Sequence, residues 1–78
     1  MRKLLTVNPN KDFTIELVYS PYQKRLFDVK PLLTKGKFSE LKNWKVFKQV
    51  RVSFDTVSWN NGMDICPDFL YETSVEID

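Results

Sequence analysis

The strongest constraint on the fold is the alternation of side chains along residues 12–20. Phe13, Ile15, Leu17 and Tyr19 fall on one side of an extended chain, whereas the residues between them are mostly polar. A period of two residues is typical of a β-strand that turns one face to a core. We therefore expect a half-buried strand here, in a sheet that forms the centre of the fold.

Two further strands are expected to lie near it. Residues 4–7 form a short apolar run that ends at an Asn-Pro-Asn turn signal. After a turn over residues 20–23, residues 24–29 can fold back as the second arm of a hairpin. Leu26 and Phe27 lie on opposite faces of that arm, so both sides of the sheet are expected to meet apolar groups.

The middle of the chain changes to a helical pattern. A short helical turn is expected at Pro31-Leu32-Leu33, with Gly36 placed to end it. Beyond it lies an amphipathic segment, and Asn43 is a plausible cap that divides it into residues 38–42 and 44–48. Its apolar stripe consists of Phe38, Leu41, Trp44 and Phe47, with Val46 and Val50 beside them. We expect the stripe to pack into the core, because a domain this small needs its rings inside.

The last third of the chain predicts strands again. Val50 and Val52 lie at even positions, whereas Val57 and Trp59 lie at odd positions, so the chain is expected to turn or bulge at residues 54–56. A three-residue loop, Asn60-Asn61-Gly62, would then set the apolar side chains of the next hairpin on one face. Its predicted pairs are Trp59 with Met63, Ser58 with Asp64, and Val57 with Ile65. A two-residue Asn-Gly loop would instead set Trp59 against Asp64, so the longer loop is favoured. Cys66-Pro67-Asp68 ends this strand, and residues 69–72 are expected to form one helical turn.

These patterns predict an α+β domain, in which short helices from the middle of the chain pack against a small antiparallel sheet of hairpins. We assign residues 1–72 to this single domain and residues 73–78 to a short acidic C-terminal tail. A chain of 78 residues, 14% of them aromatic, can bury one compact core. The N-terminal apolar run is far shorter than a signal peptide or a membrane span, so we expect a cytoplasmic protein without membrane contact.

The charges are unevenly distributed along the chain. Residues 30–51 carry a net charge of +6 and residues 52–78 a net charge of −6, within a total of +2. The two regions could neutralise each other in the fold or present separate faces to different partners. The candidate nucleic-acid contacts are Lys35, Lys37, Lys42, Lys45, Lys48 and Arg51. No known DNA- or RNA-binding motif accompanies them, and an acidic tail would repel phosphates.

No catalytic, cofactor-binding or metal-binding residue is predicted. The chain lacks His, its Ser and Cys residues have no nucleophile context, and its two glycines are too few for a phosphate-binding loop. Asp55, Asp64 and Asp68 flank the predicted hairpin and could in principle bind Mg²⁺, although roles in capping turns explain them better. The single Cys66 is expected to be a small, half-buried apolar residue. We therefore expect a protein that is not an enzyme and has no cofactor.

Four segments together carry a family resemblance: residues 25–29, 36–41, 47–50 and 57–71. The last, VSWNNGMDICPDFLY, is the most specific. They resemble a small bacterial family known only as domain of unknown function 2442, over about Leu4 to Tyr71. The chain departs from that pattern at Asn60, where the family usually has Pro. The resemblance implies an α+β fold with a small antiparallel sheet and short helices, and it carries no catalytic residues.

The resemblance also bears on partners. Some relatives continue into a C-terminal helix-turn-helix domain, and stand-alone relatives are suspected of pairing with another small protein in toxin-antitoxin-like modules. Our leading hypothesis is a non-enzymatic binding module, an antitoxin-like or regulatory partner of another small protein or a homodimer. Its contact surface would be a sheet face or edge with exposed apolar residues, Val18 and either Leu26 or Phe27 among them. The alternatives are nucleic-acid backbone binding through residues 35–51, and a carboxylate-dependent enzyme that uses Asp55 and Asp64.

Overall fold

The computed structural model describes residues 2–77, and it has the predicted α+β architecture. Three strands come first, β1 (Leu4–Pro9), β2 (Thr14–Tyr19) and β3 (Gln23–Asp28). The middle of the chain forms the 3-10 helices η1 (Lys30–Leu32) and η2 (Gly36–Lys42) and the short helix α1 (Trp44–Phe47). The last part forms β4 (Arg51–Ser53), β5 (Thr56–Ser58), α2 (Pro67–Thr73) and β6 (Val75–Ile77).

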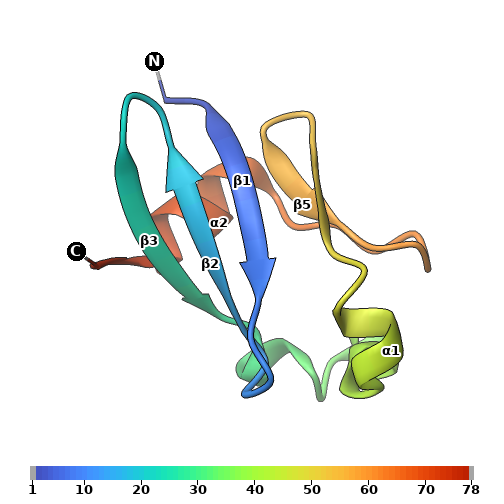
Figure 1. Cartoon of the computed structure of the whole chain (residues 1–78). Coiled ribbons are helices and arrows are strands. Elements are labelled where there is room, and N and C mark those ends of the chain that lie inside the picture. The colour runs from blue at the N-terminus through green and yellow to red at the C-terminus, as the bar shows by residue number, and fades with distance from the viewer. Residues whose placement is uncertain (1, 78) are drawn as a thin grey trace.

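The main sheet is antiparallel and has the strand order β1-β2-β3-β6. The hairpin β4–β5 forms a separate two-stranded sheet. Figure 1 shows α2 behind the main sheet and β5 beside β1, so α2 and the second hairpin lie against one side of β1, β2 and β3. The sheet therefore has one face that is covered by other elements of the chain.

The first strands have different ends from those predicted. The half-buried strand begins at Thr14 rather than at residue 12, because Phe13 has a φ of 65° and breaks the extended chain. The Asp12 carboxylate accepts hydrogen bonds from the Thr14 hydroxyl and backbone N–H, and the hydroxyl bond lowers the pKa of Asp12. Strand β1 continues through Pro9, into the predicted Asn8-Pro9-Asn10 turn signal. The turn itself is closed by a hydrogen bond from Phe13 N–H to the Asn10 carbonyl.

The helical middle is largely built from 3-10 turns. Apolar residues recur every three positions in this segment, which matches the 3.0-residue turn of a 3-10 helix better than the 3.6-residue turn of an α-helix. Asn43 divides the segment as predicted, since its side chain accepts a hydrogen bond from the Lys45 N–H at the start of α1. Gly36 was expected to end the preceding turn, but it begins η2 with a φ of 51°.

The predicted register of the final hairpin is confirmed. Trp59 N–H donates to the Met63 carbonyl, Ser58 forms a bridge with Asp64, and Ile65 N–H donates to the Val57 carbonyl. Gly62 has the predicted left-handed conformation, with a φ of 89°. The preceding turn is also where the parity change placed it, at Phe54-Asp55 between β4 and β5.

The core lies between the covered face of the sheet and the elements packed against it. The covered face contributes Ile15, Leu17, Tyr19 and Phe27, all of which are buried. Phe47 of α1 packs near Phe13 and Trp59, with ring centroids 5.0 and 6.1 Å away. The indole N–H of Trp59 donates to the Phe47 carbonyl at 3.0 Å. The rings of the helical middle and of the final hairpin therefore meet in one interior, as the sequence predicted.

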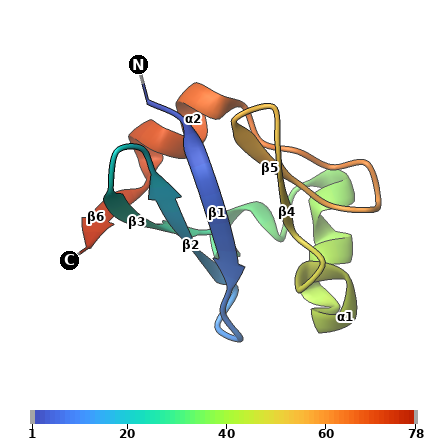
Figure 2. The same ribbon diagram turned by 45° about the horizontal axis from the view of Figure 1, so that its top comes forward.

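The C-terminal residues do not form the predicted acidic tail, as far as the structure describes them. Thr73 ends α2, and Val75–Ile77 add the strand β6 to the edge of β3. Figure 2 shows β6 on the side of β3 away from β4 and α1, so this acidic segment does not lie on the basic middle of the chain. Asp78 lies outside the described residues.

Candidate interaction surface

The second face of the main sheet is the leading candidate for a functional site. In β2, Glu16 and Val18 point away from the covered face that Ile15 and Leu17 form. The pairing of β2 with β1 and β3, and of β3 with β6, places further residues on the same side as Glu16 and Val18. We call this side the open face. It consists of Thr6, Asn8, Glu16, Val18, Lys24, Leu26, Val75 and Ile77.

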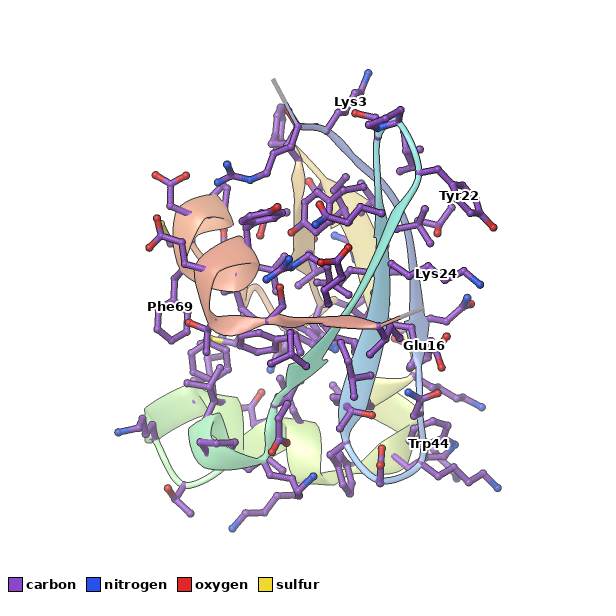
Figure 3. The ribbon with its side chains drawn as sticks, turned by 90° about the vertical axis from the view of Figure 1, so that its left-hand side faces the viewer. Lys3, Glu16, Tyr22, Lys24, Trp44 and Phe69 are labelled. Atoms are coloured by element: carbon purple, nitrogen blue, oxygen red, sulfur yellow. The ribbon has the colours of Figure 1, made fainter. Side chains whose placement is uncertain are left out.

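Apolar side chains on the open face remain accessible to solvent. Val75 is 58% exposed, and Val18, Leu26 and Ile77 are only half-buried. Figure 3 shows Tyr22, Lys24 and Glu16 on the side of the sheet away from α2, with Lys24 between Tyr22 at the β2–β3 turn and Glu16 further along the sheet. Among residues 2–77, the helices lie behind the sheet or beyond its lower end (Figures 1 and 3). The apolar residues of this face are thus left without a covering layer from the described chain.

On β2 and β3, charged and apolar residues of the open face alternate along and across the strands, whereas apolar Val75 of β6 stands opposite Leu26. Val18 stands opposite Lys24 in the β2–β3 register, and Glu16 stands opposite Leu26. Each charged residue therefore has an apolar residue directly across from it and the opposite charge on the diagonal. No hydrogen bond or ion pair within residues 2–77 joins Glu16 to Lys24, and neither residue is ion-paired elsewhere in that range.

Strand β6 is held in place by side chains behind the sheet. The Arg25 guanidinium donates to the Ser74 hydroxyl at 2.6 Å and to the Ser74 carbonyl at 2.7 Å. It also stacks on the Tyr71 ring, 4.2 Å from the centroid, while Arg2 stacks on the same ring at 4.1 Å. Tyr71 in turn donates to the Gln23 side chain. These contacts fix the end of α2 to β3, so Val75 and Ile77 enter the open face.

A shallow pocket of about 270 Å³ lies on the other side of the molecule, lined by Arg2, Tyr19, Asp55, Pro67 and Asp68. Arg2 forms an ion pair with Asp68 at 3.0 Å at its rim. The Tyr19 hydroxyl is buried and has no hydrogen-bond partner among the described residues. Burial raises the pKa of Tyr19, and the nearby positive charges of Arg2 and Arg25 oppose that rise.

The predicted carboxylate cluster is only partly assembled. Asp55 and Asp68 reach the same pocket, whereas Asp64 remains beside Ser58 in the final hairpin. Within residues 2–77, no group of three His, Cys, Asp or Glu side chains is arranged to hold a metal ion. Cys66, expected to be half-buried, is exposed because it lies at the junction where the chain enters α2 through Pro67.

The predicted nucleic-acid contacts all lie on the surface, and one of them, Arg51, is hydrogen-bonded to the final hairpin. Lys35, Lys37, Lys42, Lys45, Lys48 and Arg51 are exposed. Arg51 donates to the Asn60 side chain, which in turn donates to Gln49, and Asn61 donates to Glu40. The polar loop of the final hairpin is therefore fastened to the basic segment through Asn60 and Asn61. In the described chain none of the six cations is ion-paired with a carboxylate.

Phe54 is an exposed aromatic residue that sequence reasoning treated only as part of a turn. It is 96% exposed at the tip of the β4–β5 hairpin. Phe54 and Asp55 have φ values of 50° and 61°, as the type I′ turn of a two-residue hairpin requires. A bulky side chain is disfavoured in that conformation, which makes this tip a strained point of the fold.

The fold and the open face define a class: small α+β domains whose sheet is covered on one side and exposes a mixed apolar and charged surface on the other. The chain belongs to the family described as Protein of unknown function (DUF2442), whose model matches residues 4–76. The resemblance seen in the sequence is thereby confirmed, and the match includes most of β6. No curated protein and no solved structure gives a significant match to the chain.

Sequence reasoning missed the part of the open face that comes from β6. The apolar residues Val75 and Ile77 flank Glu76 with strand parity, and that alternation was the available signal. It is only three residues long, however, and its position among acidic residues favours a solvated tail. Among residues 2–77, no helix is long and apolar enough to cross a membrane.

Proposed function

We propose that this protein is a non-enzymatic, cytoplasmic protein-binding module whose contact surface is the open face of its sheet. The observation that carries the proposal is the uncovered apolar group formed by Val18, Leu26, Val75 and Ile77. Exposed apolar residues gathered on one face and bordered by charges are typical of protein contact sites. The module serves as an antitoxin-like or regulatory partner of another small protein, a role suggested by the family resemblance.

The test is co-expression with the product of the adjacent gene, followed by size-exclusion chromatography. The wild-type proteins are expected to elute together. Val75→Lys on the edge strand β6 and Leu26→Thr on the inner strand β3 should abolish co-elution, because each removes an apolar contact from the open face and keeps a residue compatible with its strand. The matched control is Phe54→Asp, which removes a still more exposed apolar residue from a different surface and should leave the complex intact.

Binding to nucleic-acid backbones is a second candidate function, supported by the six exposed cations that have no carboxylate partner in the described chain. It predicts binding that weakens steeply as salt rises, because condensed counterions are released from the phosphates. Lys42→Ala, Lys45→Ala and Lys48→Ala together should weaken binding to a fluorescently labelled duplex. An unchanged titration curve would exclude nucleic-acid binding through these lysines and leave protein binding as the proposed function.

A further inference from the structure

We propose that the open face binds a second copy of this chain in a two-fold symmetric dimer. The inference rests on the proposed function, since it names the partner that occupies the same surface when no other protein does. It is carried by the positions of four residues at the centre of the face. These are Glu16 and Val18 on β2, and Lys24 and Leu26 on β3.

The four residues form the corners of a rectangle on the sheet. Val18 and Lys24 occupy one cross-strand pair, and Glu16 and Leu26 occupy the pair two residues further along. The apolar residues therefore lie on one diagonal, and the two opposite charges lie on the other. A surface with this pattern is complementary to itself, because a copy turned about the apolar diagonal presents each charge to its opposite.

The direction of the symmetry axis follows from the charges. A two-fold axis parallel to β3 through Leu26 would set Lys24 against Lys24 of the copy, which is repulsive. An axis along the diagonal through Val18 and Leu26 instead sets each of these residues against its own copy. It also places Glu16 over Lys24 of the copy, and Lys24 over Glu16. The diagonal axis thus gives an apolar centre between two ion pairs.

The same rectangle sets the angle between the two sheets. Strands lie about 4.8 Å apart and two residues span about 6.8 Å along a strand, so the diagonal is inclined by about 35° to β2 and β3. Rotation about that diagonal makes the strands of the two copies cross at about 70°. Sheets that pack face to face at such steep angles belong near the orthogonal class of packing.

The size of the face indicates a weak dimer. Three strands of six residues and the three-residue β6 give a flat area of about 340 Å² for each copy. A stable protein interface usually buries about 800 Å² on each partner. The dimer should accordingly dissociate between about 1 µM and about 1 mM, and another protein that binds the open face would displace the copy.

Charge reversal at Glu16 and Lys24 gives a direct test by sedimentation equilibrium over about 1 µM to about 1 mM protein. The wild-type chain should show a monomer–dimer equilibrium. Glu16→Lys and Lys24→Glu should each weaken self-association by at least about tenfold, because like charges then face each other twice. An equimolar mixture of the two variants should associate again, and so should the double variant E16K/K24E, since both arrangements restore opposite charges across the axis.

A matched control makes the Glu-to-Lys change away from the open face. Glu72→Lys on α2 alters an exposed residue and should leave self-association unchanged. A wild-type chain that stays monomeric over the whole range overturns the inference, as does a mixture of the two reversed variants that fails to associate. A monomeric chain could still form a complex with the adjacent gene product, and Leu26→Thr could abolish that complex. In that case the proposed function stands, and only the dimer of this chain is excluded.

Discussion

The two faces of the main sheet are built from adjacent residues of the same strands, yet they have opposite surroundings. Ile15, Leu17, Tyr19 and Phe27 of the covered face are at most 2% exposed. On the open face, Val18 and Leu26 are half-buried and Val75 is 58% exposed. The covered face therefore stabilises the fold by removing apolar area from water, whereas the open face leaves such area accessible to solvent, as the proposed contact surface requires.

The largest expected difference between the two faces is in the free energy of unfolding that is lost when one residue of each face is truncated. Leu17→Ala should reduce the free energy of unfolding by about 3 kcal/mol, because it removes a buried side chain and leaves a cavity. Val18→Ala, the neighbour on the open face, should cost less than about 1 kcal/mol. Urea unfolding followed by circular dichroism measures both. Equal losses for the two variants would mean that the open face is also core.

The attachment of β6 is expected to depend on Arg25. Arg25→Met removes both hydrogen bonds to Ser74 and leaves that buried residue partly unpaired, so stability should fall by about 2 kcal/mol. Because β6 supplies Val75 and Ile77, the same variant should weaken association at the open face. Amide exchange of residues 75–77 reports the loosening of β6. Arg25→Lys is the control, since it keeps the charge without the planar pair of donors.

Replacement of the Phe54-Asp55 turn by Asn-Gly is expected to stabilise the protein by about 1 kcal/mol, because these residues adopt positive φ values at little cost. The exposed Phe54 side chain has almost no buried area to lose. Thermal unfolding of the double variant measures the gain, and its association at the open face should equal that of the wild type. Weaker association would show that Phe54 also belongs to the contact surface.

The smallest effect is expected at Tyr19 on the covered face. Tyr19→Phe should change stability at neutral pH by less than about 1 kcal/mol, because the hydroxyl it removes has no partner among the described residues. Burial raises the folded-state pKa of Tyr19. Its contribution to stability is thus complete below the unfolded pKa of about 10 and is lost as the pH rises through the folded pKa. Unfolding measured between neutral and alkaline pH should show this loss in the wild type and not in the variant.

Much of the fold could be predicted because the decisive signals are local. The alternation around Leu17 specified β2, the Asn60-Asn61-Gly62 loop specified the register of the last hairpin, and Asn43 marked the start of α1. The 3-10 geometry of η2 could also have been anticipated from its spacing of three residues.

The open face could be predicted only in part. The residues that each strand contributes follow from the local sequence, but their arrangement across strands does not. Alternation along β2 and β3 already placed apolar residues on both sides of the sheet. The diagonal pattern of Glu16, Val18, Lys24 and Leu26 depends on the register between the strands. The contribution of β6 depends on contacts between residues as distant in sequence as Arg25 and Ser74, which a short acidic segment does not reveal.

The central claim is that the open face makes contacts in solution. The most direct measurement is a series of ¹H–¹⁵N correlation spectra of the wild-type chain recorded at increasing protein concentration. The shifts that move should belong to Glu16, Val18, Lys24, Leu26 and the residues of β6, while those of η2 and α1 remain fixed. Spectra that do not change with concentration, or changes confined to the basic segment, would contradict the account.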